Sequence, residues 1–301
     1  MLALGRPRCH SGGCTAVKAA PRAAQRRRAR CASGSGIAPP PAAQAAGAGS
    51  GAAPAAAADA TGAAAPRLRP GDELDDSFAG LAGPGGLFTV AGFGSLLSER
   101  SARSTFPELQ NFRAARLRGW RRVFAHTADV FFARGIARPE TGEISSLSCE
   151  PAAGADIVVA LFEVPFSPDA VRAFIAREHE FRFVAVQPES LDGGKQEQLA
   201  VLCARNTDSE YRARRCPPDE WARRWGVRGV DRVWRDDVLP CRVYLRHCVL
   251  AAASLGAEAH ASFLDATTLA DRRTTVRQYL AAHPGIMEEL PPPELAARYS
   301  G

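Results

Sequence analysis

The chain has 301 residues, and its 38 basic and 32 acidic residues give a formal net charge of +6. This excess comes from residues 1–58, which hold eight of the basic residues and no Asp or Glu. From Asp59 onward, 30 basic residues face 32 acidic ones, so the remainder carries a net charge of −2. A nucleic-acid-binding domain is expected to keep a basic face. The charge balance therefore argues against a nucleic-acid partner.

Residues 1–58 are rich in Ala, Gly, Ser and Pro, carry eight scattered basic residues and contain no acid. This composition is typical of an organelle transit peptide. No continuous apolar run of about 7–15 residues follows the first basic residues, which excludes a secretory signal. A plain disordered tail is the alternative interpretation. The Ala and Ser content favours a chloroplast or other plastid as the destination, with the mitochondrion as the alternative.

Composition also divides the rest of the chain. Residues 59–85 are predicted to be a low-complexity linker, with order beginning near Gly86. Residues 86–283 are predicted to form one domain, and residues 284–301 are predicted to be a Pro-rich tail that lies over the surface.

Apolar patterning predicts roughly six strands followed by helices. The expected strands are 87–91, 115–124 (with Gly119 as a bulge), 144–149, 157–164, 181–186 and 199–204. The expected helices are 168–179, 209–225, 240–255 and 267–281. Because strands lead and helices close the chain, the predicted class is α+β.

Five cysteines follow residue 59, namely Cys149, Cys203, Cys216, Cys241 and Cys248. Their number is odd, their spacings are long and no CxxC pair occurs, so buried free thiols are expected rather than a disulfide framework or a zinc site. No apolar run reaches the roughly 18 residues of a membrane span. A soluble domain with no membrane partner is therefore predicted.

The first candidate site is the loop Gly92-Phe93-Gly94-Ser95-Leu96, directly after the first predicted strand. Two glycines allow a sharp turn and close approach to a ligand. Successive backbone amides in such a turn can hold a carboxylate or an oxyanion. An ordinary tight turn is the alternative on pattern alone.

The second candidate is Glu178, which interrupts the apolar face of the helix that begins at Ser167-Pro168. Val171, Phe174 and Ile175 stand at i, i+3 and i+4, and Glu178 occupies i+7, where the pattern calls for an apolar residue. Burial raises the pKa of a carboxyl, which suits a general base or acid near neutral pH. The alternatives are that the helix frays before Glu178, or that Glu178 pairs with an arginine.

Several of these segments resemble one known family. GFGSL at 92–96 resembles the GYGSL loop of the γ-glutamylcyclotransferase superfamily, and ARLRGWRRVF at 115–124 resembles the GxxRRF strand of its ChaC-type members. FIAREHEFRFVAV at 174–186 is similar to their YLxxRE…Y…V segment, whose Glu is catalytic. The predicted helix with Tyr244 looks like their closing helix. The resemblance covers roughly residues 86–265, in the expected order.

The resemblance implies a mixed sheet or small barrel with flanking helices, and a lyase that releases 5-oxoproline from a small γ-glutamyl compound, with glutathione favoured. It assigns Glu178 as the general base and acid and the 92–96 loop as the substrate loop. It implies no metal or organic cofactor. Two positions depart from the family pattern: Phe93 replaces the usual Tyr, and Glu180 stands in the following spacer.

Three functions stay open on the sequence. The first is the cyclotransferase. The second is a catalytically silent protein that binds a γ-glutamyl or acidic metabolite in the same pocket. The third is another γ-glutamyl-amine reaction on the same scaffold. The substrate and the oligomeric state are not fixed by the sequence.

Overall fold

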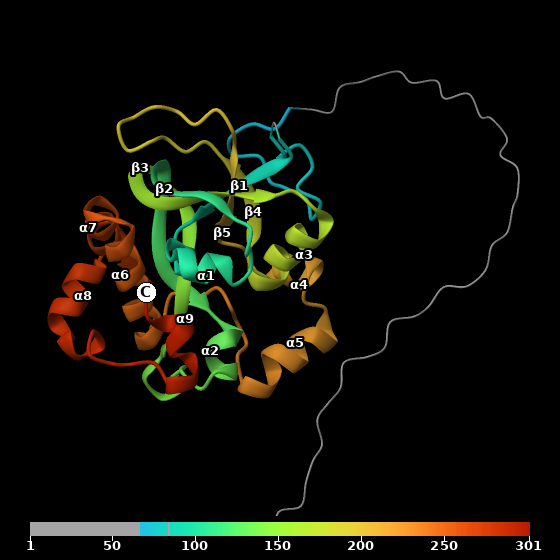
Figure 1. Ribbon diagram of the computed structural model, residues 1–301. Helices are drawn as coiled ribbons and strands as arrows, with labels where there is room; N and C mark the ends of the chain where they lie inside the picture. The colour runs from blue at the N-terminus through green and yellow to red at the C-terminus, as the bar shows by residue number, and fades with distance from the viewer. Residues whose placement is uncertain (1–66, 84) are drawn as a thin grey trace, which may run out of the picture. The chain divides into compact units, whose positions relative to one another are not determined.

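The computed structural model describes residues 67–83 and 85–301, which form an α+β fold around a mixed sheet (Figure 1). The predicted transit peptide, residues 1–58, and the first part of the predicted linker lie outside the described residues. The predicted α+β class, with helices closing the chain, is confirmed.

The sheet of the described region has seven strands in the order β4-β5-β1-β3-β2-β7, with β6 paired to β3. The strands are β1 (Leu87–Gly92), β2 (Gln110–Thr127), β3 (Glu143–Pro165), β4 (Arg182–Val186), β5 (Ala200–Ala204), β6 (Leu239–Pro240) and β7 (Thr267–Leu269). The pairs β1–β3, β2–β3 and β4–β5 are antiparallel, whereas β1–β5, β2–β7 and β3–β6 are parallel.

The central hairpin differs from the prediction in its length. The strands predicted at 144–149 and 157–164 are one strand, β3, and Glu150, Pro151 and Asp156 between them also pair with β2. The strand pairing is irregular at the predicted bulge: Gly119 has φ +79°, and the β2–β3 register shifts between Arg118 and Trp120, with the extra residues in β3. A left-handed φ suits glycine, which has no Cβ to clash.

The helices are α1 (Glu99–Arg103), α2 (Asp129–Ala133), α3 (Pro168–Arg177), α4 (Asp208–Arg214), α5 (Pro218–Arg224), α6 (Arg242–Leu255), α7 (Ala257–Asp265), α8 (Val276–Ala282) and α9 (Ala296–Tyr299). Figure 1 shows α6 to α8 gathered at one side of the sheet and α3 to α5 at the other. None of the described helices has the length and apolarity needed to cross a membrane.

Two predicted helices were wrong in part. The helix predicted at 209–225 is broken into α4 and α5, because Pro217 and Pro218 cannot continue α4. The helix predicted at 267–281 begins instead as β7, whose β-branched threonines suit a strand. Helix α8 starts only at Val276, where Thr275 and Gln278 form a capping box. Helix α7 was not predicted.

The ordered fold begins before Gly86. Residues 67–83, part of the predicted linker, pair with the outer strand β4, since the Leu74 amide donates to the Phe183 carbonyl at 2.9 Å and the Ala185 amide donates to the Asp72 carbonyl at 2.8 Å. Phe78 is fully buried, with its ring centroid 5.1 Å from that of Phe183. These residues are part of the core.

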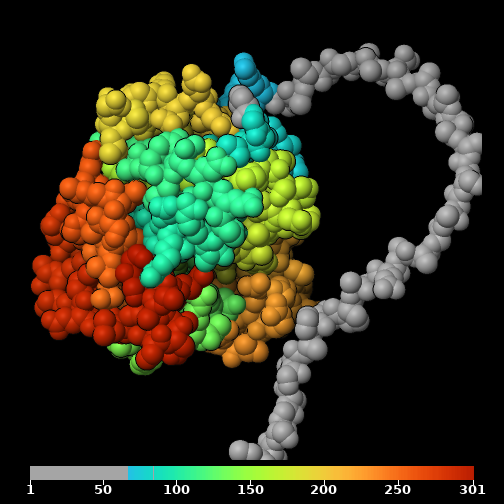
Figure 2. All heavy atoms as spheres, in the orientation of Figure 1, coloured from blue at the N-terminus to red at the C-terminus, as the bar shows by residue number. Residues whose placement is uncertain are grey.

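The C-terminal tail is also packed rather than laid over the surface. Ile286 is fully buried and Tyr299 is 3% exposed. The Gly301 amide donates to Nδ1 of His247 on α6 at 3.1 Å. In the space-filling view the C-terminal residues, in red, adjoin the light-green segment that contains α2 (Figure 2). The five cysteines after residue 59 are free and buried, as predicted.

Candidate functional site

A cavity of about 420 Å³ opens where the end of β1, α2, the end of α3, α6 and α9 converge. Its size is that of a small-molecule site. All six residues predicted to form the site line it, namely Gly92, Phe93, Gly94, Ser95, Leu96 and Glu178. The predicted meeting of the loop and Glu178 in one pocket is confirmed, and their chemical roles stay predictions.

Both glycines of the loop are required by their surroundings. A Cβ on Gly92 would lie 2.5 Å from the Cβ of Leu96, and a Cβ on Gly94 would lie 2.5 Å from the Tyr244 hydroxyl oxygen. Because Gly92 has no Cβ, the chain can turn back on itself directly after β1. Because Gly94 has no Cβ, the Tyr244 hydroxyl on α6 can lie against the loop backbone.

The loop presents unpaired backbone donors. Ser95–Leu97 form a short 3-10 helix with Gly94 at its N-terminus. Among the residues that the structure describes, the amides of Gly94, Ser95 and Leu96 donate to no acceptor. Amides at the start of such a turn form a ready anion site. The loop can therefore stabilise a negatively charged oxygen.

Phe93 supplies an apolar wall rather than a polar group. It is 7% exposed, and its ring lies edge-on to that of Phe181 at a centroid distance of 6.3 Å. Phe93 carries no hydroxyl group. Tyr244 and Ser146, whose side chains lie close to each other, also bring hydroxyl groups to the cavity lining. Burial raises the pKa of Tyr244 well above its usual range, so this hydroxyl stays protonated and able to donate.

Glu178 lies at the C-terminal end of α3. The helix ends at Arg177, but the Glu178 amide still donates to the Phe174 carbonyl at 2.9 Å. Glu178 therefore keeps the direction of the Val171–Phe174 face, and its side chain is 16% exposed. Both alternative interpretations hold in part, because the helix stops two residues earlier than predicted and Glu178 pairs with an arginine.

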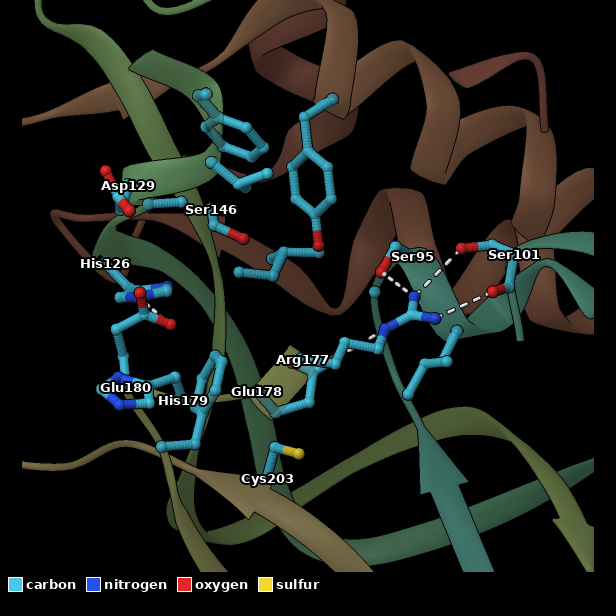
Figure 3. Close-up of a pocket in the computed structure, with 18 of the residues that line it drawn as sticks. Ser95, Ser101, His126, Asp129, Ser146, Arg177, Glu178, His179, Glu180 and Cys203 are labelled. Atoms are coloured by element: carbon cyan, nitrogen blue, oxygen red, sulfur yellow. Dashed lines mark hydrogen bonds and ion pairs between the residues drawn. The ribbon is translucent and has the colours of Figure 1, made fainter. Parts of the chain in front are cut away.

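That arginine is Arg177, which the sequence pattern placed off the apolar face. Its Nε donates to Glu178 Oε1 at 3.0 Å, and its two terminal nitrogens donate to the Ser95 hydroxyl, the Thr105 hydroxyl and both oxygens of Ser101 at 2.8–3.0 Å. Figure 3 shows this guanidinium between Glu178 and the loop. Arg177 thus ties Glu178 to the Ser95 side chain of the loop, 82 residues earlier in the sequence. The helical pattern did not mark it, although Arg177-Glu178 matches the Arg-Glu pair of the YLxxRE segment.

Glu180 also lines the cavity, on the side of Glu178 that faces away from the loop (Figure 3). It is 8% exposed, and burial raises its pKa to about 7, with the neighbouring Glu178 and Asp129 carboxylates adding to the effect. Its Oε2 lies 4.0 Å from Nε2 of His126. His126 stacks on Trp234 with ring centroids 4.6 Å apart, and burial lowers its pKa to about 3. A protonated Glu180 beside a neutral His126 is the expected state below pH 7.

The Trp- and Arg-rich segment that follows β5 walls this end of the cavity. Trp225 is fully buried, and the Tyr211 hydroxyl lies 3.0 Å from Nδ1 of His179. Arg224 reaches the cavity and pairs with Glu220 and Asp129. The segment therefore forms part of the cavity wall.

Within residues 67–83 and 85–301, no group of three or more His, Cys, Asp or Glu side chains is placed to hold a metal ion. The cavity instead offers a carboxylate, backbone amides and hydroxyl groups. These groups suit proton transfer and oxyanion stabilisation.

No family model matches the sequence, and no curated protein matches it. Solved structures with a similar fold include a human protein described as uncharacterized, at 12% identity and a TM-score of 0.32, covering 49% of this chain and 89% of that one. A gamma-glutamyl cyclotransferase matches at 11% identity and a TM-score of 0.32, covering 48% and 89%. A protein from Arabidopsis thaliana matches at 15% identity and a TM-score of 0.31, covering 43% and 77%.

Proposed function

We propose that the protein is a γ-glutamylcyclotransferase, which releases 5-oxoproline and an amine from a γ-glutamyl compound. One observation carries the proposal. Glu178 lines the same cavity as the loop whose three unpaired amides are those of Gly94, Ser95 and Leu96, and Arg177 donates both to the Glu178 carboxylate and to the Ser95 hydroxyl of that loop. The motifs of residues 92–96 and 174–186 support it independently.

The reaction needs a base that later becomes an acid. The substrate's α-ammonium first loses a proton to Glu178, and the free amine then attacks the γ-carbonyl carbon to close a five-membered ring. As the tetrahedral intermediate collapses, the bond to the departing nitrogen breaks. Glu178 returns its proton to that nitrogen. The ring nitrogen, which still carries two hydrogens after the attack, gives up its second proton, and the departing amine takes it up and leaves as an ammonium ion. Glu178 is therefore regenerated as a carboxylate.

The carbonyl oxygen gains negative charge during the attack. In this proposal the loop amides donate to it, and preorganised donors of this kind are often the largest catalytic contribution. Because both reacting groups belong to one molecule, a cavity that holds the substrate bent supplies much of the remaining rate. Arg177 acts as a positioning residue, since it fixes Glu178 against Ser95.

Glutathione is the favoured substrate within this proposal, with Cys-Gly as the departing amine. The support is the likeness of residues 174–186 to the ChaC-type segment.

The test incubates the purified full chain with a panel of γ-glutamyl compounds and measures 5-oxoproline by mass spectrometry. We expect release from at least one of them, with glutathione among the best. Absence of release from every compound would contradict the proposal.

A silent binding protein is the second candidate, and Phe93 favours it because the loop lacks the usual tyrosine hydroxyl. Calorimetric titration with the same compounds separates the two functions. Binding without any 5-oxoproline release would support the binding protein.

A further inference from the structure

Two arginines that line the cavity take no part in the mechanism above. Arg134 follows α2 and Arg298 lies on α9, and both line the cavity. They come from segments 164 residues apart, brought together by the packed C-terminal tail. Arg134 donates to the Tyr299 hydroxyl at 2.6 Å, and its guanidinium lies 5.4 Å from the centre of that ring.

These guanidinium groups differ from the other arginines of the cavity. Arg177 pairs with Glu178, and Arg224 pairs with Glu220. Within the described part of the chain, by contrast, neither Arg134 nor Arg298 lies within 4.0 Å of any carboxylate. Burial lowers the pKa of Arg298, and the positive charges of Arg134 and Arg177 lower it further. The protein thus holds like charges together with no acid of its own between them.

Such an arrangement is unfavourable unless an anion joins it. Arginine presents a planar fork of donors that matches a carboxylate. We propose that Arg134 and Arg298 form a carboxylate site, and that the substrate presents a carboxylate to it. This inference rests on the proposed function for the identity of the substrate, but its binding test does not require turnover.

A γ-glutamyl compound can offer two carboxylates. The α-carboxylate belongs to the γ-glutamyl group itself and is present in every such compound. A second carboxylate exists only when the departing amine is an amino acid or peptide. The two sources are separated by a matched ligand pair, γ-glutamylalanine and γ-glutamylalanine amide, which differ only in the second carboxylate.

The experiment measures binding of both ligands by calorimetry in the Glu178→Gln background, where the ligand is not consumed. Arg134→Gln and Arg298→Gln are each expected to raise Kd by about 10- to 100-fold, the range for a hydrogen bond to a charged group. Arg134→Lys and Arg298→Lys should recover part of the loss, because they keep the charge without the fork. Arg172→Gln, on the exposed side of α3, is the control for loss of charge and should leave Kd unchanged.

The pattern of losses identifies the carboxylate. A loss confined to γ-glutamylalanine assigns the pair to the departing group, and the substrate class is then γ-glutamyl amino acids and peptides. An equal loss with both ligands assigns it to the α-carboxylate. Folded Gln variants that bind both ligands like the parent overturn the inference, as does a parent that binds neither. The proposed function is judged separately, by 5-oxoproline release from the wild type.

Discussion

The Arg177 guanidinium donates to its chain neighbour Glu178 at 3.0 Å and, from another nitrogen, to the Ser95 hydroxyl at 3.0 Å. One buried side chain therefore sets the position of the proposed base relative to the proposed oxyanion donors. Only 8% of the Arg177 side chain is exposed, so solvent does not compete for these bonds.

The first prediction concerns which acid transfers the proton. Glu178→Gln keeps the shape of the side chain but removes its basicity, and kcat should fall by about 10²–10⁴-fold while folding and substrate binding persist. Glu180→Gln is expected to be much milder, because Glu180 lies on the far side of Glu178 from the loop. The measurement is 5-oxoproline release, with circular dichroism as the folding control. A dead Glu180→Gln beside an active Glu178→Gln would reverse the assignment.

The second prediction tests the role of Arg177. Lysine keeps the positive charge but cannot reproduce the fork that reaches Glu178, Ser95 and Ser101 together. Arg177→Lys should lower the free energy of unfolding by about 1–3 kcal/mol, and should lower kcat more than it changes KM. Arg172→Lys is the control on the same helix, with a 69% exposed side chain. An unchanged kcat in a folded Arg177→Lys would argue against a positioning role.

The third prediction concerns the loop backbone. Gly94→Ala forces a shift between the new Cβ and the Tyr244 hydroxyl, so the free energy of unfolding should fall by about 1–3 kcal/mol. Tyr244→Phe in the same chain removes the clashing oxygen and should restore part of the stability but not the activity. Gly226→Ala is the control, because its nearest contact would be an ordinary 3.8 Å. Chemical denaturation of the wild type, Gly94→Ala, Tyr244→Phe and the double variant gives the coupling energy between the two residues. This energy would be zero if the two residues did not touch.

The fourth prediction is a pH dependence of stability from Glu180. Its folded-state pKa of about 7 lies above the ordinary value of 4.5, so the folded protein binds the proton more tightly than the unfolded chain does. The stabilising contribution is present below pH 4.5 and is lost as the pH rises through 7. Relative to Glu180→Gln, the wild type should lose at most about 3 kcal/mol over this interval. If the free energies of unfolding of the two proteins changed in parallel from pH 4.5 to 8, the raised pKa of Glu180 would be refuted.

The fifth prediction concerns the leader. Composition places the N-terminus of the mature protein between residues 31 and 75, and the contacts of residues 67–83 with the sheet move the upper limit to about residue 67. N-terminal sequencing of the protein purified from plastids measures it. A retained Met1 would contradict the transit-peptide interpretation.

The parts of this site that could be predicted are those that a local pattern marks. Glu178 interrupts an apolar helix face, and Gly92 and Gly94 bracket a bulky residue after a strand. Arg177 could not be found in the same way, since a charged residue off the apolar face ordinarily points to solvent. Its burial depends on contacts with a loop and a helix some 70–80 residues earlier.

Long-range pairing explains the other differences. Residues 151–156 of β3 have the composition of a turn, yet pairing of Pro151 and Asp156 with the long partner β2 keeps the two ends of this segment in the sheet. Arg134 and Arg298 line the same cavity only because the tail folds back, and no spacing rule connects two residues so far apart.

The segment of residues 67–83 has a consequence for how the protein behaves in concentrated solution. Strand β4 is the outermost strand on its side of the sheet, and its backbone groups would otherwise be free to recruit a strand from another molecule. Hydrogen bonds from Gly71 and Leu74 occupy that edge, and Phe78 anchors the segment in the core beneath. A truncated form starting at residue 86 would expose both the strand edge and the vacated phenylalanine pocket, and so would aggregate where the longer chain stays dispersed.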